Sequence, residues 1–217
     1  MGFFSGISNL LFPPRCAFCR RILKRGGSGM CSSCEKAISY TENGGRQTGD
    51  FFTVCVSPLY YEGIVRESIL RFKFKEATAY ASLFGRLIAD CIRKHLAGCY
   101  DLISWVPLSA KRLKKRGYDQ AMLLAMAAAL ELDDVAVETL IKHIDVPAQS
   151  GVGSKEKRKA NIAGAYRVSD PELVQGRRIL LIDDIVTSGS TLSECARTLL
   201  QAGAAEVVCA TLARARD

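Results

Sequence analysis

The clearest chemistry in the sequence lies at residues 179–191, ILLIDDIVTSGST. Asp183 and Asp184 end an apolar run typical of a buried strand, and ligands of open α/β sheets bind beyond the carboxyl ends of strands. The small residues from Thr187 to Thr191 then open a helix, where backbone N–H groups and the helix dipole favour an anion. Paired carboxylates would repel an anion but suit hydroxyl groups or a metal. A ribose 5-phosphate, with a phosphate close to a cis-diol, meets both demands.

Other uses of an acidic pair at a strand end fit less well. The chain contains no G-x-x-x-x-G-K-[ST] segment, which excludes a P-loop nucleotide hydrolase. A receiver-like acidic pocket needs a further acidic pair near the first strand and a phosphorylatable aspartate elsewhere, and neither is evident. A purely structural role for the two acids is the alternative that stays open.

Four of the nine cysteines form a second cluster, near the N-terminus. They make two Cys-x-x-Cys pairs with eleven residues between the pairs. Zn²⁺ binds four thiolates in a closed tetrahedron, so the spacing predicts a structural zinc site that staples a segment too small for its own core. The alternatives are a redox pair or free thiols. The predicted ligands are Cys16, Cys19, Cys31 and Cys34.

Composition bounds the class of protein. The chain has 217 residues, of which 48% are hydrophobic and 24% charged, as in a globular domain with a small appendage. It has no run of about 18 apolar residues, and its apolar start lacks the basic segment and cleavage site of a signal peptide. We therefore expect no membrane span and a cytoplasmic protein. The odd number of cysteines argues against a disulfide framework.

The net charge of +8 is concentrated in basic runs at residues 71–75, 111–116 and 155–159. Such runs are either solvated loops or a surface for a polyanion, which could be a nucleic acid or a polyphosphate ligand. Charge alone does not separate these alternatives.

Strand and helix patterns alternate from about residue 50 onward. This order predicts an α/β fold with a mostly parallel sheet flanked by helices on both faces. We assign residues 1–45 to a zinc-binding ribbon and residues 46–217 to the α/β domain. The predicted strands are 51–61, 101–108, 137–143, 164–170, 177–184 and 205–215, and the predicted helices are 63–73, 77–97, 119–132 and 190–203.

The segment ILLIDDIVTSGST resembles the phosphoribosyl pyrophosphate (PRPP) motif of type I phosphoribosyltransferases. The cysteine pairs, LRFKFK, VPLSAKRLKKRGYDQAMLLA and AQSGVGSKEKRKANIAGAY resemble one branch, the ComF family of competence-associated proteins with an N-terminal zinc ribbon. This resemblance implies a type I phosphoribosyltransferase-like fold. It also implies that Asp183 and Asp184 hold the ribose hydroxyls. The 5-phosphate would then lie against Thr187, Ser188, Gly189, Ser190 and Thr191.

The same resemblance implies two further loops around the ligand. A pyrophosphate loop would contain Leu108, Ser109 and Lys111. A mobile loop at 147–161 would close over the site, although an ordinary solvated loop is the alternative. Its candidate residues are Gln149, Lys155, Arg158 and Asn161. The 6-oxopurine branch carries an aspartate where this chain has Thr187, which argues against hypoxanthine or guanine as the acceptor.

These features lead to two functional hypotheses. The first is a phosphoribosyltransferase that binds PRPP with Mg²⁺ and acts in DNA uptake, although no residue stands out as an acid or base for an acceptor. The second is a non-catalytic adaptor that keeps the phosphate-binding fold and binds single-stranded DNA or a partner such as a DNA translocase.

Overall fold

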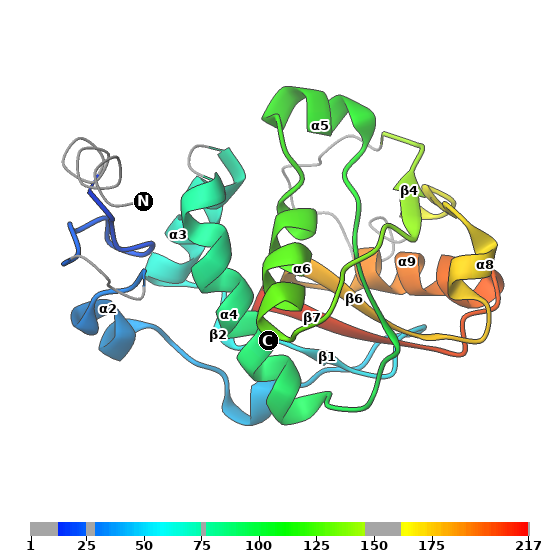
Figure 1. Cartoon of the computed structure of the whole chain (residues 1–217), viewed down its shortest axis with the longest axis horizontal. Coiled ribbons are helices and arrows are strands. Elements are labelled where there is room, and N and C mark those ends of the chain that lie inside the picture. The colour runs from blue at the N-terminus through cyan, green and yellow to red at the C-terminus, as the bar shows by residue number, and fades with distance from the viewer. Residues whose placement is uncertain (1–12, 25–28, 75–76, 146–161, 217) are drawn as a thin grey trace.

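The computed structural model describes residues 13–24, 29–74, 77–145 and 162–216. Its centre is a five-stranded sheet in which every strand pairing is parallel. β6 and β7 lie in the middle, β3 flanks β6, and β1 and β2 pair with the other side of β7 (Figure 1). The predicted parallel sheet is therefore confirmed. The strands are β1 (Cys55–Val56), β2 (Leu59–Tyr60), β3 (Leu102–Trp105), β6 (Arg178–Val186) and β7 (Glu206–Arg214).

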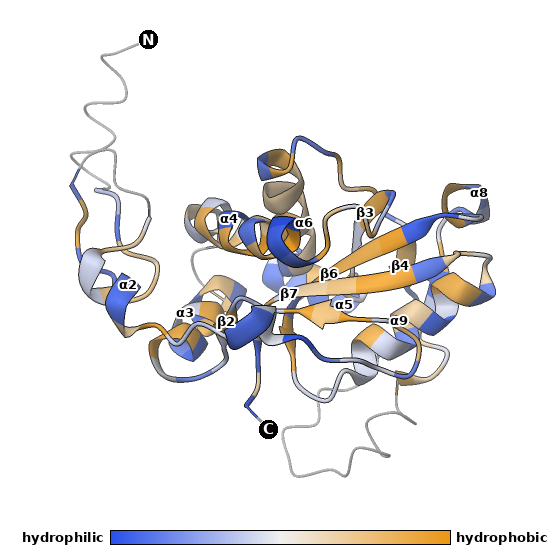
Figure 2. Ribbon diagram, turned by 90° about the horizontal axis from the view of Figure 1, so that it is seen from below, coloured by the Kyte–Doolittle hydropathy of each residue, from blue (hydrophilic) through white to orange (hydrophobic). Residues whose placement is uncertain are grey.

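Helices cover both faces of this sheet, as predicted. Leu180 and Ile182 of β6 belong to the core cluster under α4 and α6, whereas Ile179 and Leu181 belong to the cluster under α9. Figure 2 shows α4 and α6 on one side of the strands and α9 on the other. A strand buried on both faces needs an unbroken apolar run, which explains the sequence ILLI. The helices are α3 (Gly63–Phe74), α4 (Ala77–His95), α6 (Gln120–Glu131) and α9 (Ser190–Gln201).

Smaller elements lie around this sheet. The strands predicted at 137–143 and 164–170 are β4 (Leu140–Lys142) and β5 (Tyr166–Val168), which form a separate antiparallel pair. The helices α5 (Ala110–Arg116) and α8 (Pro171–Val174) were not predicted. The sequence of α5, AKRLKKR, contains a single large apolar residue and so lacks the periodicity that reveals a helix.

The N-terminal ribbon packs directly on the helices. An antiparallel bridge between Arg15 and Ile22 encloses the first Cys-x-x-Cys turn. The second cysteine pair lies at the start of α2 (Ser32–Ala37), with Cys31 as its N-cap residue and Cys34 inside the helix. The 3₁₀ helix η1 (Glu42–Gly45) follows and leads to the sheet. Phe18 contacts Phe84 of α4 with ring centroids 6.0 Å apart, so the ribbon shares the core cluster of α3 and α4.

Two expectations concern membranes and the mobile loop. In the described parts of the chain, no helix is both long and apolar enough to cross a membrane. The predicted mobile-loop residues Gln149, Lys155, Arg158 and Asn161 lie outside the described residues.

Candidate functional site

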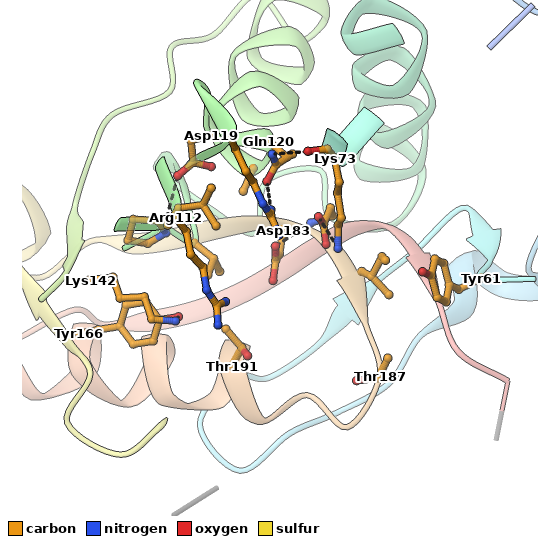
Figure 3. Close-up of a pocket in the computed structure, with 17 residues that line it drawn as sticks. Tyr61, Lys73, Arg112, Asp119, Gln120, Lys142, Tyr166, Asp183, Thr187 and Thr191 are labelled. Carbon is orange, nitrogen blue, oxygen red and sulfur yellow. Dashed lines mark hydrogen bonds and ion pairs between the residues drawn. The ribbon is translucent and has the colours of Figure 1, made fainter. Parts of the chain in front are cut away.

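A cavity of about 370 Å³ opens at the carboxyl ends of β3 and β6 (Figure 3). This is where the parallel topology predicts a ligand. Its wall is strongly charged and carries both signs, which suits a ligand with anionic groups at one end and hydroxyl groups at another. The cations are Lys73, Arg112, Arg116 and Lys142, and the acids are Asp119, Asp183 and Asp184.

The acidic pair at the end of β6 lies at the centre of this cavity. Asp184 is buried and forms an ion pair with Lys73 of α3, with 2.9 Å between Oδ2 and Nζ. Asp183 is only partly buried, and its Oδ1 accepts a hydrogen bond from the Asp184 N–H at 2.7 Å. One acid is thus neutralised by the protein, while the other is available to a ligand.

The pKa values of Asp183 and Lys73 are both shifted in this cluster. Burial raises the pKa of Asp183 to about 8, and the charge of Asp184 acts in the same direction. Burial alone would lower the pKa of Lys73, but Asp184 and Asp183 together raise it above its usual value. Lys73 therefore stays charged. A ligand group that stabilises the Asp183 carboxylate would lower the raised pKa of Asp183.

The predicted phosphate loop forms a small hollow of its own. This hollow has a volume of about 40 Å³, and residues 187–191 contribute to its lining together with Asp183. Gly189 precedes α9 with a φ of 71°, and among the described residues no side chain caps this end of the helix. The N–H groups of the first turn thus point toward the hollow without a side-chain acceptor, which is the arrangement that favours an anion.

The need for glycine at position 189 arises from its backbone rather than from crowding. A Cβ added there would meet the ring of Phe52 at 3.5 Å, which is an ordinary contact. A φ of 71° is strained for other residues, above all for β-branched ones. A larger residue would therefore displace the loop instead of blocking the phosphate directly.

The structure places the predicted pyrophosphate-loop residues in different surroundings. Leu108 lines the cavity, but its N–H already donates to Asp119 Oδ2 at 2.7 Å. Ser109 caps α5 by accepting from the Arg112 N–H, and its Oγ donates to Asp145 at 2.5 Å. The side chain of Lys111 is 84% exposed and lies 3.9 Å from Asp145. Only Leu108 of the three therefore lines the described cavity.

Asp119 fixes the geometry of this wall. Besides the Leu108 N–H, it accepts the Met122 N–H through Oδ1 at 3.1 Å and so caps the start of α6. Burial raises the pKa of Asp119, although both N–H donors act to lower it. The loop after β3 and the first turn of α6 are thus held by one carboxyl group.

The four cations that line the cavity were not predicted as site residues from the sequence. Figure 3 shows Arg112, Lys142 and Tyr166 on the same side of the cavity as Thr191, with Lys73 on the opposite side. Lys142 Nζ donates to the Tyr166 hydroxyl at 3.1 Å, and burial lowers the pKa of Lys142. Arg112 falls in the basic run 111–116, but only the short helix α5 reveals which of its members face inward.

The four predicted zinc ligands come together in the ribbon. The sulfur atoms of Cys16, Cys19, Cys31 and Cys34 all lie within 4.8 Å of one another. A tetrahedral site with Zn–S bonds of about 2.3 Å requires sulfurs about 3.8 Å apart, and the Cys19 and Cys31 sulfurs are 3.6 Å apart. The Cys31 N–H also points at the Cys16 sulfur, 3.4 Å away. The arrangement fits a structural zinc with no open coordination position.

Comparisons with known proteins agree with both parts of the chain. The profile of the double zinc ribbon domain matches residues 7–50, and that of the phosphoribosyl transferase domain matches residues 119–217. Competence protein F of Haemophilus influenzae is 32% identical, over 93% of this chain and 97% of that protein. DNA utilization protein YhgH of Escherichia coli K12 is 30% identical, over 94% of this chain and 100% of that protein.

Among solved structures, the glutamine PRPP amidotransferase of Bacillus subtilis in complex with ADP and GMP is similar at 22% identity. That alignment has a TM-score of 0.41 and covers 59% of this chain and 25% of the amidotransferase. The matched domain profile and the parallel sheet together identify the type I phosphoribosyltransferase fold. The chain thus combines an N-terminal zinc ribbon with a phosphoribosyltransferase domain, and it is similar to competence protein F over nearly its whole length. It belongs to the ComF family.

Proposed function

We propose that this protein binds PRPP with Mg²⁺ in the cavity at the end of β6 and acts in the handling of DNA during uptake. The observation that carries the proposal is the direct succession of the acidic pair and the uncapped start of α9. Asp183 lines both the large cavity and the small hollow, so a sugar on the acids can place its phosphate in the loop.

Each part of PRPP has a matching set of side chains. The ribose hydroxyls would donate to Asp183 and Asp184, and the 5-phosphate would accept from the backbone of residues 187–191. The diphosphate would extend toward Leu108 and the cations Arg112 and Lys142. We assign Ser109 and Lys111 a supporting role in this loop, since both shortly precede Arg112 in the chain and contact Asp145.

Mg²⁺ suits this donor set because it prefers carboxylate and phosphate oxygens and keeps several waters. When bound, it would neutralise the diphosphate as a leaving group. The protein's own contribution to phosphoribosyl transfer would be to position the sugar and to stabilise charge, with Arg112 and Lys142 at the departing pyrophosphate. The acceptor stays open, because none of the described residues that line the cavity is assigned as a base for it.

A role in DNA handling is supported by the relatives, which are named for competence and DNA utilization. It implies a cytoplasmic protein. We also retain the division into a ribbon of residues 1–45 and a phosphoribosyltransferase-like domain of residues 46–217 as a proposal.

The second candidate function, an adaptor for single-stranded DNA or a DNA translocase, is favoured by the surface beside the cavity. α5 displays a row of lysines, and Arg116 lies over the exposed ring of Phe74, 5.1 Å from its centroid. Cations next to an exposed aromatic ring are typical of surfaces that stack single-stranded bases. DNA lacks the 2′-hydroxyl, so a strand would occupy this surface rather than the acidic pair.

Titration calorimetry separates the two functions. PRPP with Mg²⁺, ribose 5-phosphate and an oligothymidylate would each be titrated into the zinc-loaded protein, alone and in competition. The proposal expects PRPP to bind more tightly than ribose 5-phosphate and to depend on Mg²⁺. Binding of the oligonucleotide alone, with no heat from PRPP, would leave only the adaptor function.

A further inference from the structure

The helix α3 lies beside the zinc ribbon (Figure 1) and shares its core cluster. Its residue Lys73 lines the ligand cavity. Ser68 and Arg71 face the ribbon. The buried Ser68 Oγ donates to the Ala17 carbonyl at 2.6 Å, and the Arg71 guanidinium donates to the carbonyls of Ala17 and Phe18. Both carbonyls belong to the turn between Cys16 and Cys19, so α3 holds the backbone of the first zinc-binding turn.

Two residues further along the same helix, Lys73 faces the cavity. Residues two apart on an α-helix project about 200° apart, which places Arg71 and Lys73 on opposite sides of α3. Lys73 forms the ion pair with Asp184 at 2.9 Å, and both side chains are largely buried. One rigid turn of helix therefore connects the zinc-binding turn to a carboxylate of the acidic pair.

The end of α3 is also fixed by the wall of the cavity. The Tyr118 hydroxyl donates to the Phe72 carbonyl at 2.6 Å, and Gln120 donates to the Lys73 carbonyl at 3.5 Å. Phe72 packs edge-on against Phe84, the same ring that Phe18 of the ribbon contacts. Because these groups are closely packed, a displacement of the ribbon turn would be transmitted through them to Lys73.

We propose that α3 couples the zinc ribbon to the ligand site, with Arg71 as a positioning residue that acts through Lys73 on Asp184. Filling the zinc site fixes the Cys16–Cys19 turn, and this turn fixes the position of the ion pair. By linkage, a ligand that engages Asp184 must in return strengthen zinc retention. The expected effect on PRPP binding rests on the proposed PRPP site, whereas the expected effect on zinc binding does not.

The first test uses Arg71→Met, which leaves all four cysteines in place. It also removes the buried Arg71 Nε, for which the described residues provide no partner, and this limits the loss of stability. Arg66→Met is the matched control, because Arg66 is exposed on the same helix and carries the same charge. Ser68→Ala serves as a second variant if Arg71→Met does not fold.

Metal analysis and calorimetry with PRPP–Mg²⁺ and with sulfate would be run on each protein. We expect Arg71→Met to keep its zinc and its sulfate affinity but to bind PRPP about fivefold more weakly, the lower end of common coupling factors. Arg66→Met should match the parent. Parent-like PRPP affinity in a zinc-loaded Arg71→Met protein would overturn the coupling.

The second test needs no ligand, and so it also separates this inference from the proposed function. Zinc affinity would be measured by equilibrium competition with a chromogenic chelator for the parent, Lys73→Met and Arg66→Met. Loss of the ion pair should weaken zinc binding about fivefold, and only in Lys73→Met. Equal zinc affinities in all three proteins would refute the coupling. A parent that gives no heat with PRPP would refute the proposed ligand and leave this result to stand.

Discussion

Replacement of Asp183 by Asn should make the free protein more stable while it weakens ligand binding. Burial raises the pKa of Asp183 to about 8 in the folded protein, against an ordinary value of 3.8. The folded state therefore holds this proton more tightly than the unfolded chain does. The stabilisation that the bound proton gives the folded state is complete below a pH of about 4 and is lost as the pH rises toward 8.

The size of the effect follows from the linkage between pKa and stability. One pKa unit corresponds to about 1.4 kcal/mol, so ionised Asp183 costs the fold on the order of a few kcal/mol above pH 8. Asparagine keeps the shape but carries no charge. Because 1 kcal/mol shifts Tm by about 2–4 °C at this chain length, Asp183→Asn should raise Tm by about 5 °C or more near pH 8. Near a pH of about 4 the two proteins should melt alike.

The same substitution should weaken PRPP binding. A hydrogen bond to a charged acceptor contributes roughly 1.5–3 kcal/mol, so the affinity should fall by about ten- to a hundredfold. Above a pH of about 8, sulfate binding in the loop should persist or improve, because the substitution then removes a negative charge. Calorimetry with PRPP, ribose 5-phosphate and sulfate would measure each affinity.

Asp184→Asn is the matched control and should change stability in the opposite direction. Its carboxylate neutralises Lys73, and the two side chains are only 13% and 19% exposed. Removal of one partner leaves a buried charge uncompensated, which lowers Tm. Scanning calorimetry of both variants near pH 8 decides the matter. If Asp183→Asn melts below the parent there, or if the two variants shift Tm in the same direction, the account of the acidic pair is wrong.

Three further substitutions test the zinc site, the phosphate loop and the cations. Cys31→Ser should lose most of the roughly one zinc that the parent binds, so equal zinc in both by metal analysis would argue against the tetrahedral site. Gly189→Val should abolish binding of sulfate and PRPP alike, since the strained φ would displace the loop; sulfate binding that survives in calorimetry would contradict this. Arg112→Met should weaken PRPP about tenfold and leave ribose 5-phosphate unaffected, because Arg112 is assigned to the diphosphate. An equal loss for both ligands would reassign it.

The parts of the fold and site that could be predicted from the sequence are those written in contiguous residues. The run ILLI predicts a buried strand, and the acids that follow must lie at its carboxyl end. The cysteine spacing predicts a closed metal site, because two Cys-x-x-Cys turns can converge on one ion whatever surrounds them. In both cases the chemistry depends on neighbours along the chain.

The rest depends on contacts between distant segments. Lys73 reaches Asp184 across 111 positions of sequence, and no local pattern marks it among the cations of its basic run. Lys142 enters the cavity only because β4 pairs with β5, which brings Tyr166 beside it. Lys111 and Arg112 are adjacent basic residues, and the sequence does not reveal which of them faces the cavity. The orientation of α5 exposes the first and turns the second toward the cavity.

The double role of Asp119 has a consequence for how this protein can diverge. Its two carboxyl oxygens accept from separate N–H groups, one in the loop after β3 and one in α6. Asparagine offers one acceptor and would turn an NH₂ group toward a donor, glutamate adds a methylene to a buried site, and serine is too short to span both. A substitution of Asp119 therefore cannot remove one contact and keep the other. The loop after β3 and the start of α6 must change together in evolution. Relatives that keep both contacts should carry aspartate at this position, whichever molecule accepts the phosphoribosyl group in them.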